Sequence, residues 1–126
     1  MATDTPATAL QLSKEHLERV LEARDEPDWA NLSMFGLYCL EAAVKAAALK
    51  VGIYPKKASH AQKQDFAEQL AKQHGLPDIS DLLADLNEIR KSEAYGDIEN
   101  PPELDAADVS GEIEAYVKKV AALIGV

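Results

Sequence analysis

The sequence predicts an all-α fold, namely an up-and-down antiparallel bundle of four to five helices in a single domain. Apolar residues recur every three to four positions through most of the 126 residues. Glycines and prolines stand where these stretches end, and no run of β-branched residues alternates with polar ones. Hydrophobic residues make up 47%, which is sufficient for a core in a chain of this size without metals or disulfides.

The first helix is expected from about Thr8 to Arg24, after a flexible tail at 1–7. It should end before Pro27, because proline disfavours helical geometry in the residue before it.

The second helix is expected at Trp29 to Val51, with Asp28 as its N-cap and Gly52 just past its end. It is apolar on nearly all sides, and one of its stripes contains Phe35, Tyr38, Ala42, Ala46 and Leu49. This composition is typical of a central helix. Its alanines and its glycine would allow close helix approach, either within the chain or across a dimer.

The remaining helices follow from their end signals. Ser59 is expected to cap a third helix at 60–74, which Gly75 closes. A fourth is expected at about 78–95, and its apolar spacing places Arg90 in line with core-facing residues. A fifth starts near Asp105.

Charge restricts the classes of partner. The net charge is −9, from 22 acidic and 13 basic residues, which argues against broad adhesion to nucleic acid or anionic membranes. However, five lysines and no acidic residue lie between Ala42 and Gln64. This segment is either an ordinary solvated face or an anion-accepting patch.

A cytoplasmic location is expected. The chain start lacks the basic and apolar segments of a secretory signal, and its single cysteine, Cys39, cannot form an internal disulfide. Glu41, Lys45 and Lys50 argue against a membrane span at 29–51.

Strong chemical motifs are missing from the sequence. It contains no glycine-rich phosphate loop, no cysteine pair and no His-x-x-x-His spacing, so no metal or cofactor is expected. Arg90 is the most informative residue, because an arginine in a core-facing position either pairs with a buried acid or holds an anion. Glu41 is its expected partner, and Tyr95 would lie beside the same cleft.

Three motifs together resemble a known family. They are Glu41 with Lys45 four residues later, Ser59-His60, and Arg90-Lys-Ser-Glu-Ala-Tyr95. This layout is similar to the HEPN family, small helical bundles named for their occurrence in higher eukaryotes and prokaryotes and for nucleotide binding. In that family an arginine, followed four to six residues later by a histidine, cleaves RNA across a dimer without metal. Arg90 matches the arginine, but positions 95–97 are Tyr, Gly and Asp.

Without that histidine, the resemblance implies a small prokaryotic, non-catalytic binding module that forms a homodimer. Its ligand would be a nucleotide-like anion, or its partner a nucleotidyltransferase, in a stress or toxin–antitoxin setting. The expected ligand-binding residues are Arg90, Lys45, Glu41, His60 and Tyr95. One alternative is a metal-independent ribonuclease that uses Arg90 with Tyr95 or His60, although the acidic charge disfavours RNA as a partner. Another is a purely structural helical dimer.

Overall fold

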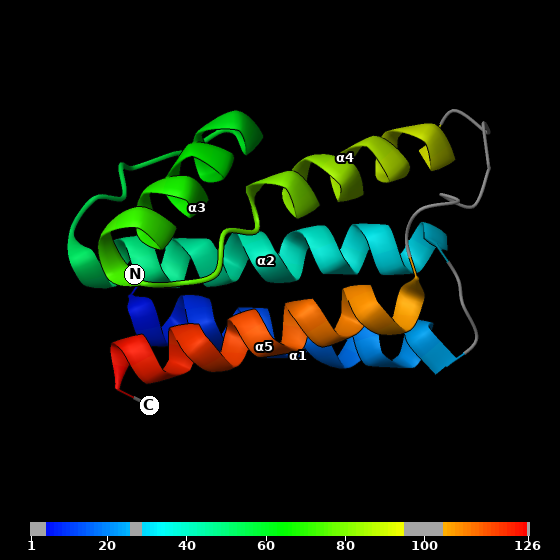
Figure 1. Cartoon of the computed structure of the whole chain (residues 1–126), viewed down its shortest axis with the longest axis horizontal. Helices are drawn as coiled ribbons and strands as arrows, with labels where there is room; N and C mark the ends of the chain where they lie inside the picture. Colours follow the sequence, from blue (N-terminus) through cyan, green and yellow to red (C-terminus); the bar gives the residue numbers. More distant parts are fainter. Residues whose placement is uncertain (1–4, 26–28, 95–104, 126) are drawn as a thin grey trace.

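A computed structural model describes residues 5–25, 29–94 and 105–125, which form helices and no strand. The helices are α1 (Pro6–Asp25), α2 (Trp29–Val51), α3 (His60–His74), α4 (Ser80–Ala94) and α5 (Ala106–Ile124). Figure 1 shows α1, α2, α4 and α5 alternating in direction along one axis, whereas α3 is tilted across the C-terminal half of α2. The predicted all-α bundle is confirmed.

The centre of the bundle is α2, which every other helix contacts. Its alanines at 43, 46 and 47 are fully buried. Gly36 lies so close to its neighbours that a Cβ atom there would stand 3.1 Å from Ile113 Cδ1 and 3.3 Å from Leu86 Cδ1. The small residues therefore allow α4 and α5 to approach within the chain, which is the first of the two alternatives left open by the sequence.

The apolar character of α2 also satisfies a membrane-span criterion. By length and composition alone, an 18-residue window of α2 is apolar enough to cross a membrane, even though the whole helix contains Glu41, Lys45 and Lys50. In the bundle, 72% of that window is buried by the rest of the chain, as in the core helix of a folded domain.

The ends of α3 follow the sequence signals. Ser59 Oγ accepts a hydrogen bond from the Gln62 amide at 3.2 Å, and Gln62 Oε1 accepts one from the Ser59 amide at 2.9 Å. This reciprocal capping box fixes the start of the helix. Gly75 ends it with a left-handed backbone at φ 70°, so both predicted caps are confirmed.

Two helix starts differ from the expected ones. α1 begins at Pro6 because Thr5 and Thr8 hydrogen-bond each other's amides, so the predicted tail at 1–7 is too long. α4 begins at Ser80, since the Asp78 carboxylate accepts hydrogen bonds from the Ser80 amide at 3.0 Å and its hydroxyl at 2.6 Å. The expected N-cap Asp28 and the expected helix end at Tyr95 lie outside the described residues.

Some of the polar groups in the core are satisfied and others are not. Ser13 Oγ donates to the Cys39 carbonyl at 2.8 Å, and burial raises the pKa of the Cys39 thiol to about 11. The Tyr116 hydroxyl is buried and has no hydrogen-bond partner among the described residues. Burial likewise raises the pKa of Tyr116 above its ordinary value.

The contacts of two glycines predict opposite effects on stability. We expect Gly36→Val to lower the free energy of unfolding by roughly 1–3 kcal/mol, because extra methyl groups would overpack the α2–α4–α5 contact. Gly111 in α5 is exposed with open space around it, so Gly111→Ala should raise stability by about 0.5–1 kcal/mol. Urea denaturation measures both, and equal effects of the two substitutions would contradict the packing described for Gly36.

Candidate functional site

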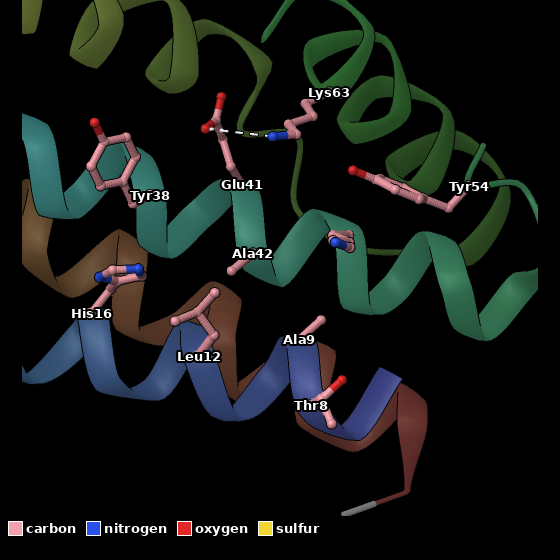
Figure 2. Close-up of a pocket in the computed structure, with 10 residues that line it drawn as sticks. Thr8, Ala9, Leu12, His16, Tyr38, Glu41, Ala42, Tyr54 and Lys63 are labelled. Atoms are coloured by element: carbon pink, nitrogen blue, oxygen red, sulfur yellow. Dashed lines mark ion pairs between the residues drawn. The ribbon is translucent and has the colours of Figure 1, made fainter. Parts of the chain in front are cut away.

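A pocket of about 300 Å³, open to solvent on one side, lies where α1, α2, α3 and the segment after α2 meet. Figure 2 shows its lining, which is Thr8, Ala9, Leu12, His16, Tyr38, Glu41, Ala42, Lys45, Tyr54 and Lys63. Steps of three or four residues place the α1 members on one face and the α2 members on another. The pocket therefore lies between one face of α1 and one face of α2, with Lys63 contributed by the first turn of α3.

One end of the pocket is aromatic and apolar. The His16 ring centroid lies 5.8 Å from that of Tyr38 and 6.2 Å from that of Phe35. Leu12 and Tyr38 are 48% and 37% exposed, which makes them the two large hydrophobic side chains most open to solvent in the described part of the chain. Desolvation lowers the pKa of His16, against a smaller opposing effect of Glu15, so its ring is mainly neutral at pH 7.

The other end carries two ammonium groups. Lys45 Nζ lies 5.4 Å from the centroid of the Tyr54 ring, within range of a cation–π contact. The Tyr54 ring in turn packs at 5.8 Å from that of Phe66 on α3. Lys63 reaches in from α3, and its Nζ lies 3.7 Å from Glu41 Oε1 (Figure 2).

Glu41 lines the same pocket, with a side chain only 7% exposed. Its Oε2 contacts His60 Nδ1, and its Oε1 faces Lys63. A buried carboxylate needs such partners, because its desolvation is costly when it is left alone. Both come from the first turn of α3, so the capped start of that helix fixes the position of the carboxylate.

The structure brings together three of the five predicted ligand-binding residues. Glu41 and Lys45 line the pocket, and His60 contacts Glu41 from its edge. Tyr95 lies outside the described residues.

Arg90 lies elsewhere, and its expected pairing with Glu41 is wrong. Its Nη2 donates to Asn87 Oδ1 at 2.8 Å, while its Nε is buried without an acceptor among the described residues. The reason is the register of α4 on α2: Leu86 packs against Gly36. Because the two helices run in opposite directions, Arg90 falls beside α2 residues before Gly36, whereas Glu41 lies after it.

Sequence reasoning missed most of the pocket. It did not single out His16 or Tyr54 as site residues, and it assigned Tyr38 to an apolar stripe. It included Lys63 only as one of the five lysines at 42–64 that could form an anion-accepting patch. The available signal was the helical spacing of lining residues on each helix, for example Leu12 with His16 on α1 and Tyr38 with Lys45 on α2. In the described part of the chain, no group of three or more His, Cys, Asp or Glu side chains is placed to hold a metal ion.

No protein-family model matches the chain, and a search of curated proteins gives no match. The HEPN resemblance stays a prediction based on the motifs quoted above.

The environment of His16 predicts a pH dependence of stability. Its pKa is lower in the folded chain than in the unfolded one, so the unfolded chain binds the proton more readily. The contribution of neutral His16 to the free energy of unfolding is present above the unfolded pKa of about 6.5. It is lost as the pH falls through the lower pKa of the folded chain. We expect His16→Phe, which keeps an aromatic ring, to lose less stability than the unsubstituted chain between pH 7.5 and 5. If the free energy of unfolding fell equally with pH in the unsubstituted chain and in His16→Phe, the lowered pKa of His16 would be contradicted.

Proposed function

We propose that this chain is a non-catalytic binding module whose pocket takes a small anionic ligand with a planar ring, of nucleotide-like type. The observation that carries the proposal is the convergence of Lys45 from α2 and Lys63 from α3 in one pocket with an aromatic end. A pocket of about 300 Å³ that combines aromatic side chains with a few charged groups has the size of a small-molecule site.

The two ends of the pocket suit the two parts of such a ligand. A planar ring can stack on Tyr38 and the neutral His16 ring beside Leu12, since stacking on an aromatic side chain favours any flat heterocycle. A phosphate or carboxylate can accept charge-assisted hydrogen bonds from Lys45 and Lys63. Figure 2 shows Tyr38 and Tyr54 at opposite ends of the pocket. In the proposed orientation the ligand ring lies at the Tyr38 end and the anion at the other end, where Lys45 lies over Tyr54.

Arg90 is not part of the proposed ligand site. This arginine matches the family motif, yet it does not line the pocket and its guanidinium is hydrogen-bonded to Asn87.

The biological setting within this proposal comes from the HEPN resemblance. It comprises a cytoplasmic homodimer, with a nucleotidyltransferase as a further partner, in a stress or toxin–antitoxin system. Supporting it are Glu41, Lys45 and His60, which match family positions and lie at one place. Because the small residues of α2 are packed inside the chain, a dimer would use a different surface.

Calorimetric titration with nucleoside monophosphates tests the pocket. We expect binding by the unsubstituted chain and at least about tenfold weaker binding by Lys45→Gln, the effect of losing one hydrogen bond to a charged group. Lys72→Gln removes an exposed charge outside the pocket and serves as the matched control. An equal loss of affinity in Lys45→Gln and Lys72→Gln would contradict the proposal, as would a failure of the unsubstituted chain to bind any nucleoside monophosphate.

Incubation with RNA in the presence of EDTA tests the ribonuclease alternative. We expect no cleavage by the unsubstituted chain or by Arg90→Ala, because the histidine of the family motif is missing from positions 95–97. Cleavage that disappears in Arg90→Ala would establish the alternative and overturn a non-catalytic role.

A further inference from the structure

We infer that the negative charge of Glu41 limits how much negative charge a bound ligand can carry, so that the pocket selects a nucleoside monophosphate over the corresponding triphosphate. This inference rests on the proposed function and concerns the same pocket. It follows from the charges that line the pocket, from the distance between Lys63 Nζ and Glu41 Oε1, and from the fixed position of the Glu41 carboxylate.

The formal charge of the lining is small. Lys45 and Lys63 contribute two positive charges and Glu41 one negative charge, and no other Lys, Arg, Asp or Glu is among the lining residues. The whole chain carries a net charge of −9, which adds a general repulsion of anions. The lining therefore suits a ligand with one or two negative charges rather than four.

The Glu41 carboxylate lies close to where the anion would bind. Lys63 Nζ is 3.7 Å from Glu41 Oε1, so a ligand oxygen bonded to that ammonium at about 2.8 Å lies at most about 6.5 Å from the carboxylate oxygen. This separation is shorter than the screening length at physiological ionic strength, about 8 Å. Repulsion between Glu41 and each added phosphate charge is thus only partly screened.

Glu41 cannot easily turn away to relieve this repulsion. Its side chain is 7% exposed and is held by both His60 and Lys63. Those partners belong to the first turn of α3, which the Ser59–Gln62 capping box fixes. The carboxylate is consequently a permanent feature of the pocket wall.

Titration calorimetry with adenosine, AMP, ADP and ATP in magnesium-free buffer tests the inference on three chains. The unsubstituted chain should bind AMP at least about tenfold more tightly than ATP. Glu41→Gln should reduce this AMP-to-ATP preference at least about fivefold, because it removes the negative charge and keeps the side-chain shape. Glu68→Gln removes an exposed charge from α3 outside the pocket and should leave the preference unchanged.

A second measurement needs no substitution, in case Glu41→Gln weakens the fold. Raising the salt concentration should narrow the AMP-to-ATP preference of the unsubstituted chain, because screening weakens the extra repulsion of ATP more than that of AMP. Equal affinity for AMP and ATP at low salt would overturn the role of Glu41. An unchanged preference in a folded Glu41→Gln chain would also overturn it, and in both cases the proposed function would stand. Failure of all four compounds to bind would instead overturn the proposed function.

Discussion

Burial of one helix on all sides is the constraint on which the rest of the structure depends. Four helices pack on α2, so its surface must be apolar and, where α4 and α5 come closest, as small as Gly36. Glu41, in the middle of the helix, is an exception because its buried side chain is a carboxylate. Breaking a buried ion pair by removing one partner costs roughly 3–5 kcal/mol. The carboxylate therefore requires the start of α3 above it, where His60 and Lys63 supply its partners, and the pocket forms beside this contact.

The fold was predictable where the signals are local. Ser59 and Gly75 bound α3 as expected, and α2 covers the predicted residues 29–51, because caps and helix-stopping residues act within a few positions. The starts of α1 and α4 differed from prediction for an equally local reason. Side chains such as Asp78 bond the first helical amides, and the choice among several capable residues depends on the path of the incoming chain.

The site was less predictable, because spacing along one helix does not fix its register against another. Glu41 and Lys45 share a face of α2 by their separation of four, and that much was readable from sequence. The contact of His60 with Glu41 and the distance of Arg90 from it both depend on how α3 and α4 lie along α2. The place of Arg90 was decided by a packing contact at Gly36 that no charge pattern indicates.

The buried thiol of Cys39 can be used to measure local opening of the bundle. It is the only cysteine in the sequence, it lies fully covered beside Ser13 of α1, and its pKa of about 11 leaves little thiolate at neutral pH. A thiol reagent reaches it only when the surrounding helices open, and separation of α1 from α2 would expose it, so the rate of alkylation reports the free energy of such opening. Since α1 also forms a wall of the pocket, any molecule that bridges α1 to α2 would protect this sulfur from modification.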